Sequence, residues 1–197
     1  MVRPASGAGQ LGLDMGVSSE VHRLFFALWP NAAMRQQFAL IADRLRASGA
    51  LSGDWLEPAK YHATLHFLGD SSALRGDVVE AAQRAAGRIE PGGGSWALDR
   101  IDSFHGRRPP CILRSAADPP ALRALWQSLR EALILEGVGK PLGAPAFTPH
   151  VTLAYASRPL AAPIPLEPLL WQVDRLALIH SSDAFKGYRV LAEWPLQ

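Results

Sequence analysis

An apolar run and an amphipathic stripe follow one another near the start of the chain. The run over 23–29 predicts a buried strand, because it is continuous and lies between a polar stretch and Pro30. Asn31 is then placed to cap a helix whose apolar positions recur every three or four residues as far as Leu45. Gly49 is expected to end this helix.

Strand-like runs dominate the remainder of the chain, with two further helical stripes between them. One helix is expected to be capped by Ser71 or Ser72, and the other to begin at Asp118 with Pro119. A proline-rich segment over 159–168 is expected to form a long connection. The expected strands cover residues 61–70, 96–104, 111–115, 150–155, 171–180 and 187–194. Since strands and helices do not alternate regularly, the pattern predicts an α+β fold rather than a doubly wound parallel sheet.

The composition is typical of a folded globular protein. Of 197 residues, 48% are hydrophobic and 19% are charged, which is enough apolar material for a sizeable core. We expect residues 1–20 to form a flexible tail and residues 21–197 to form a single domain. No apolar stretch is long enough to cross a bilayer, so no association with a membrane is expected.

The net charge and the cysteine content limit which binding partners and which cellular compartment we expect. A net charge of +2 excludes a strongly basic protein that wraps DNA, but it permits a local basic site for a phosphate group. The lone cysteine, Cys111, cannot form an internal disulfide and suits a reducing compartment. No obligate protein partner is evident, and we expect a cytoplasmic monomer.

A short internal repeat is the most informative feature of the sequence. Residues 62–67 are HATLHF and residues 150–155 are HVTLAY, so both segments have the pattern His-x-Thr-Leu-x-aromatic. Positions two apart in a strand point to the same side of the sheet. We therefore expect each histidine to share a face with its threonine, and His66 to lie on that face as well. Two similar strands would bring both His-Thr pairs together.

Two facing histidines suit a reaction in which one proton is removed and another is delivered. Imidazole titrates near neutrality, so one ring can act as base while the other acts as acid. A hydroxyl beside each ring can donate a hydrogen bond to an anionic oxygen. Cleavage of a phosphodiester fits this combination of groups.

The first motif also permits a metal site and a role for its aromatic residue. His62 and His66 have the spacing of a zinc-protease pair, but Ala63 stands where that pattern has a glutamate, and the segment predicts a strand. We therefore expect no metal ion. Phe67 is expected in the core rather than stacked on a base.

Both motifs and their flanks resemble the two-histidine (2H) phosphoesterase superfamily. The matching segments are RLFFAL at residue 23, HATLHFLGD at residue 62 and FTPHVTL at residue 147. They are most similar to the RNA 2′,3′-cyclic phosphodiesterases first called 2′-5′ RNA ligases. The resemblance implies an α+β fold of two pseudo-symmetric lobes, each an antiparallel sheet with helices packed outside and a groove between them. It also implies hydrolysis of an RNA or nucleotide 2′,3′-cyclic phosphate to a 2′-phosphate, without metal or cofactor.

The resemblance assigns roles to individual residues. His62 would donate a proton to the departing 3′ oxygen, and His150 would accept a proton from water. Thr64 and Thr152 would bind the phosphate oxygens. Many relatives carry an arginine where this chain has Tyr155, so Tyr155 and His66 are further candidates for substrate contact and the substrate preference stays open.

Two other functions are compatible with the same residues. The reverse reaction would make the protein a 2′-5′ RNA ligase that needs no ATP, because the same two proton transfers can run backwards. A non-catalytic RNA-binding module would keep the groove without the chemistry. The intact His-Thr pairs favour an enzyme.

Overall fold

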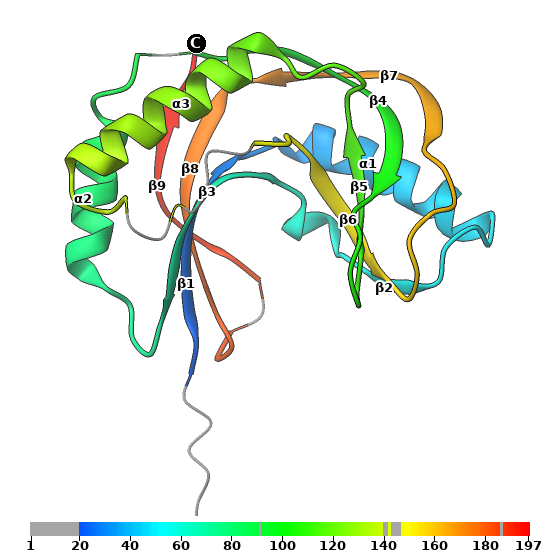
Figure 1. Cartoon of the computed structure of the whole chain (residues 1–197), viewed down its shortest axis with the longest axis horizontal. Helices are drawn as coiled ribbons and strands as arrows, with labels where there is room; N and C mark the ends of the chain where they lie inside the picture. The colour runs from blue at the N-terminus through cyan, green and yellow to red at the C-terminus, as the bar shows by residue number, and fades with distance from the viewer. Residues whose placement is uncertain (1–19, 91, 140–141, 143–146, 186) are drawn as a thin grey trace, which may run out of the picture.

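In the part of the chain that the structure describes, two antiparallel β-sheets and three α-helices make up the fold (Figure 1). The computed structural model describes residues 20–90, 92–139, 142, 147–185 and 187–197. The predicted tail lies outside the described residues, except for Glu20. The α+β prediction is confirmed, as is the prediction of two antiparallel lobes.

Each sheet combines strands that lie far apart in the sequence. The four-stranded sheet consists, in spatial order, of β3 (Ala63–Ser71), β1 (His22–Leu28), β8 (Arg175–Ser182) and β9 (Arg189–Pro195). The five-stranded sheet consists of β2 (Gly53–Trp55), β6 (Val151–Ala156), β5 (Pro110–Arg114), β4 (Gly94–Ser103) and β7 (Ile164–Val173). The chain therefore passes from one sheet to the other several times.

The helices divide between the two sheets. In α1 (Ala32–Ala47), the Asn31 side chain accepts a hydrogen bond from the Met34 amide at 2.9 Å, so the predicted cap is confirmed. Phe38 packs on Trp171 of β7, which places α1 against the five-stranded sheet. The other two helices, α2 (Gly76–Ala86) and α3 (Pro120–Leu135), pack on each other, and α3 lies against β3.

One apolar core joins both sheets and all three helices. Its contribution from α3 is the predicted stripe, which is fully buried: Leu122, Leu125, Trp126, Leu129 and Leu133. Among the described residues, no helix is both long and apolar enough to span a membrane.

The predicted start of α2 is wrong. Strand β3 continues through Ser71, whose hydroxyl donates to the Ala73 carbonyl, and the helix begins only at Gly76. Neither Ser71 nor Ser72 is therefore its cap. The buried face of α2 consists of alanines, which allows α3 to approach closely.

The predicted strand over 171–180 is also wrong in part. Asp174 separates β7 from β8, and these two strands belong to different sheets. Furthermore, β7 begins at Ile164, inside the segment expected to be a long connection. Prolines are tolerated there because β7 is an edge strand of its sheet.

Candidate active site

The two histidine motifs lie where the sheets meet. His62 directly precedes β3 and His150 directly precedes β6, and these two strands contact each other although they belong to different sheets. The two rings are close enough for the charge of His150 to lower the pKa of His62. The structure therefore brings together the residues that the repeat singles out.

Both catalytic candidates are held in the same orientation by the backbone. Nδ1–H of His62 donates to the Lys60 carbonyl at 2.7 Å, and Nδ1–H of His150 donates to the Thr148 carbonyl at 2.7 Å. In the neutral rings, Nε2 therefore carries the lone pair. The Thr64 hydroxyl donates to Nε2 of His62 at 3.1 Å. Each histidine thus presents the nitrogen that can exchange a proton with a ligand.

Aromatic side chains surround the two imidazoles. Phe25 lies 5.1 Å from the His62 ring, and Tyr188 meets the same ring edge-on at 5.2 Å. Phe104 meets His150 edge-on at 4.9 Å. These apolar surroundings restrict access of water to the rings and disfavour their charged forms.

Burial lowers the pKa of both histidines. For His62 it lowers the pKa from 6.5 to about 4, against the effect of the Lys60 carbonyl, and the charges of His150 and Arg35 act in the same direction as burial. For His150 burial also lowers the pKa, opposed by the Thr148 carbonyl. Both rings are therefore mainly neutral at pH 7 in the free protein.

The expectation that His66 shares the face of His62 and Thr64 is wrong. In the pairing of β3 with β1, Thr64 lies opposite Ala27 but His66 lies opposite Phe26, so Leu65 is an extra residue in a β-bulge. The bulge turns His66 to the other side of the sheet. There it is only 3% exposed, stacks on Trp126 and hydrogen-bonds through Nε2 to the Trp126 carbonyl at 2.8 Å.

The same bulge reverses the prediction for Phe67. It turns this side chain onto the face of Thr64, where it is 43% exposed rather than part of the core. Because His62 and His66 do not share a face, they cannot bind one metal ion. Among the described parts of the chain, no three His, Cys, Asp or Glu side chains cluster as a metal site.

A second bulge occurs at the equivalent place in β6. Thr152 lies opposite Ile112 and Ala154 lies opposite Cys111, so Leu153 is the extra residue and Tyr155 comes onto the face of Thr152. Tyr155 is 41% exposed. The guanidinium of Arg108 lies 5.9 Å from the centre of its ring.

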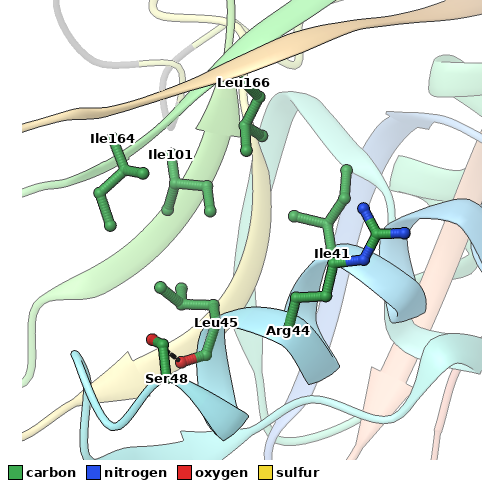
Figure 2. Close-up of a pocket in the computed structure, with 7 residues that line it drawn as sticks. All are labelled: Ile41, Arg44, Leu45, Ser48, Ile101, Ile164 and Leu166. Carbon is green, nitrogen blue, oxygen red and sulfur yellow. Dashed lines mark hydrogen bonds between the residues drawn. The ribbon is translucent and has the colours of Figure 1, made fainter.

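Two residues near His62 had no signal in the sequence. The Trp29 ring lies 6.2 Å from the His62 ring. The Arg35 guanidinium lies over the Trp29 ring, 4.3 Å from its centroid. No motif or periodicity marks Arg35, because it reaches the site from a helix that packs on the other sheet. An apolar cavity of about 340 Å³ between α1, β4 and β7 lies elsewhere, since none of its lining residues belongs to either histidine motif (Figure 2).

Comparisons with known proteins agree with this geometry. LigT of E. coli in complex with 3′-AMP is 26% identical, covers 91% of this chain and 99% of its own, and superposes with a TM-score of 0.71. The structure of the same enzyme with ATP is 27% identical, covers 90% of this chain and 99% of its own, and has a TM-score of 0.70. TT0787 of Thermus thermophilus is 25% identical, covers 88% of this chain and 97% of its own, and has a TM-score of 0.65.

The family assignment rests on a match along the chain itself. A search of curated proteins finds no match. A family model described as the 2′-5′ RNA ligase superfamily matches residues 33–184, which is more than half of the chain. The chain therefore belongs to the 2′-5′ RNA ligase superfamily of two-histidine phosphoesterases, as the resemblance of its motifs implies.

Proposed function

We propose that the protein hydrolyses RNA or nucleotide 2′,3′-cyclic phosphates to 2′-phosphomonoesters by acid–base catalysis between His62 and His150. One observation carries this proposal. The Nδ1–H groups of both rings are bound to backbone carbonyls two residues earlier, so the Nε2 atoms are the groups left for proton transfer. Relatives of similar fold bind nucleotides, as the LigT complexes with 3′-AMP and ATP illustrate.

In the proposed reaction, water attacks phosphorus opposite the 3′ oxygen. Nε2 of His150 takes a proton from this water as the new P–O bond forms. The P–O3′ bond breaks, and its electron pair stays on O3′, which takes the proton from Nε2–H of His62. The product is a 2′-phosphomonoester and a free 3′-hydroxyl. The two rings have then exchanged protonation states and re-equilibrate with solvent.

The threonines would bind the phosphate oxygens. In the free protein the Thr64 hydroxyl donates to Nε2 of His62. Once His62 is protonated, this nitrogen no longer accepts a hydrogen bond, and the hydroxyl is released to donate to a phosphate oxygen. Thr152 would donate to another phosphate oxygen beside His150, and Tyr155, which shares the face of Thr152, would contact the substrate.

A monomer in the cytoplasm remains our proposal for the setting of this activity. The cytoplasmic setting is supported by the lone cysteine, Cys111, which is free and has no second cysteine with which to form an internal disulfide.

The test is hydrolysis of nucleoside 2′,3′-cyclic phosphates with and without EDTA, with products separated by chromatography. We expect a 2′-phosphate at a rate unaffected by the chelator. His62→Ala and His150→Ala should each lower the rate by about 10²- to 10⁴-fold. The matched control is His66→Gln, which changes a histidine of the same motif on the opposite side of the sheet and should leave the rate unchanged.

A modified leaving group separates the acid from the base. A substrate with sulfur in place of O3′ needs little protonation, because a thiolate is far less basic than an alkoxide. Sulfur should therefore restore much of the rate of His62→Ala but not that of His150→Ala. Rescue of His150→Ala instead, or a 3′-phosphate product, would contradict the assigned roles. Formation of a 2′-5′ linkage with a 5′-hydroxyl oligonucleotide would show the reverse reaction.

A further inference from the structure

Arg35 is a partly buried cation without a hydrogen-bond partner among the described residues. Its Nε and Nη2 atoms are inaccessible to solvent and have no acceptor there, while the guanidinium lies 4.3 Å from the centre of the Trp29 ring. Buried cations are normally paired, because leaving such a group unpaired is costly. Stacking on Trp29 compensates for only part of this cost.

The carboxylate whose charge acts on Arg35 already has a partner. Glu193 pairs with Arg175 at 3.6 Å, and Arg175 itself carries a positive charge that acts on Arg35. The three groups together therefore keep a net positive charge. Arg35 also lines an open cavity of about 440 Å³ between α1 and the 3-10 helix Pro58–Lys60. Asp43 also lines this cavity, but the charges that act on Arg35 are those of Arg175 and Glu193. A positive group without a carboxylate partner of its own suits an anionic ligand.

The position of Arg35 relative to the two histidines indicates which anion it would bind. It stacks on Trp29, whose ring lies 6.2 Å from that of His62, and its charge lowers the pKa of His62. The pKa of His150 is instead governed by burial and by the Thr148 carbonyl. Arg35 thus lies on the His62 side of the site rather than midway between the rings.

The connectivity of a nucleotide relates this side to a second phosphate. If His62 protonates O3′, then C3′ lies beside His62, and C3′ leads through C4′ and C5′ to the 5′ oxygen. O2′ and C1′, which carries the base, lie toward His150. We propose that Arg35, stacked on Trp29, binds the 5′-phosphoryl group of the nucleotide whose cyclic phosphate reacts between His62 and His150. This inference rests on the proposed function, and it adds a second phosphate site to it.

Binding of that group would also prepare His62 as an acid. The titratable groups that face His62 are His150 at the start of β6, Arg35 from α1, and Tyr188 between β8 and β9. A phosphate bound to Arg35 offsets its charge, so the pKa of His62 rises toward neutrality. Substrates with a 5′-phosphoryl group should therefore bind more tightly and react faster near pH 7.

The experiment compares kcat/KM for uridine 2′,3′-cyclic phosphate with and without a 5′-phosphate. We expect wild type to prefer the 5′-phosphorylated substrate by about tenfold or more, as for a hydrogen bond to a charged group. Arg35→Gln should abolish this preference. The control, Arg44→Gln, changes an arginine on the opposite face of α1 and should keep it. The ratio within one variant is independent of the amount of folded enzyme.

Two further experiments identify the source of the phosphate and the effect of Arg35 on the pKa of His62. A dinucleotide that ends in a cyclic phosphate carries an internucleotide diester in place of the 5′-monoester. An equal preference for it supports recognition along an RNA chain, whereas preference for the monoester alone assigns the site to a free 5′ end. With the 5′-hydroxyl substrate, Arg35→Gln should raise kcat/KM along the high-pH limb, because the positive charge that lowers the pKa of His62 is gone. A merely structural role would not move this limb.

Failure of the inference is distinguishable from failure of the proposed function. Hydrolysis of both substrates with equal kcat/KM in wild type, or a preference that survives Arg35→Gln, overturns the phosphate site and leaves the function standing. If neither substrate is hydrolysed, the affinities for adenosine 2′-phosphate and adenosine 2′,5′-bisphosphate, measured by calorimetry, decide whether Arg35 binds a 5′-phosphate. Tighter binding of the bisphosphate to wild type but not to Arg35→Gln supports the site, and equal affinities refute it.

Discussion

The pH dependence of kcat/KM should lie on the acid side of neutrality. Burial, with the charges of His150 and Arg35, lowers the pKa of His62 from 6.5 to about 4. At pH 7 only about one free molecule in a thousand then carries a proton on His62. The proposed reaction needs protonated His62 beside neutral His150. We therefore expect kcat/KM to fall about tenfold per pH unit at pH values above the pKa of His150.

The pH dependence of kcat should be displaced toward neutrality relative to that of kcat/KM. In the substrate complex, an anionic phosphate lies between the rings and favours their charged forms. The assay is hydrolysis of a nucleoside 2′,3′-cyclic phosphate from pH 4.5 to 9 at constant ionic strength. Circular dichroism across the same range verifies that the protein stays folded. Apparent pKa values belong to the coupled pair of histidines rather than to either one.

A neutral optimum would refute this reasoning. If kcat/KM is constant or rises between pH 6 and pH 8, then the free enzyme does not need a proton on a histidine whose pKa is lowered. The 3′-thio substrate provides the control. Its leaving group needs little protonation, so the fall of kcat/KM at high pH should be weaker with this substrate than with the oxygen substrate.

Three further sets of variants test the site and the fold. The double variant of His62→Ala and His150→Ala should lose less activity than the product of the two single losses, measured as kcat, because the two rings act as a unit. Thr64→Val and Thr152→Val should each lower kcat/KM by about 10- to 150-fold, the effect of one hydrogen bond to a charged oxygen; unchanged kinetics in both would mean that the hydroxyls do not bind phosphate. Burial lowers the pKa of His66 to about 4, against the effect of its hydrogen bond to the Trp126 carbonyl. Because the ring therefore takes up a proton mainly on unfolding, the stability of the fold should decrease as the pH falls from 6.5 to about 4. This decrease should be smaller by roughly 3 kcal/mol in His66→Gln, measured by urea unfolding at pH 7 and pH 4; an equal decrease would contradict the buried neutral state.

Much of the site could be predicted from the sequence, because its chemistry depends on residue types at short spacing. The repeat of His62 with Thr64 and of His150 with Thr152 predicts an acid–base pair and two hydroxyl donors. The local rules for helices also hold, as the Asn31 cap and the buried stripe of α3 illustrate. These features involve residues within a few positions of one another, where backbone geometry alone determines which side chains share a face.

The two bulges could not be predicted in this way. The rule that positions two apart share a face fails at Leu65 and Leu153, because each strand inserts an extra residue opposite its partner. As a result His66 turns into the core, while Phe67 and Tyr155 turn outward. The sequence of one strand does not show how it pairs with the next, and pairing decides where a bulge occurs.

Contacts between segments far apart in the sequence determine the other features of the fold and the site. Asp174 divides one apolar run between two sheets, and the chain around it does not show which strands each half will join. Arg35 lies near His62 although α1 packs on the five-stranded sheet and β3 belongs to the four-stranded sheet. No local sequence pattern predicts this proximity. Residue type and short-range periodicity are properties of the chain alone. Strand partners, lowered pKa values and the charge of Arg35, which has no hydrogen-bond partner among the described residues, arise only when segments far apart in sequence pack together.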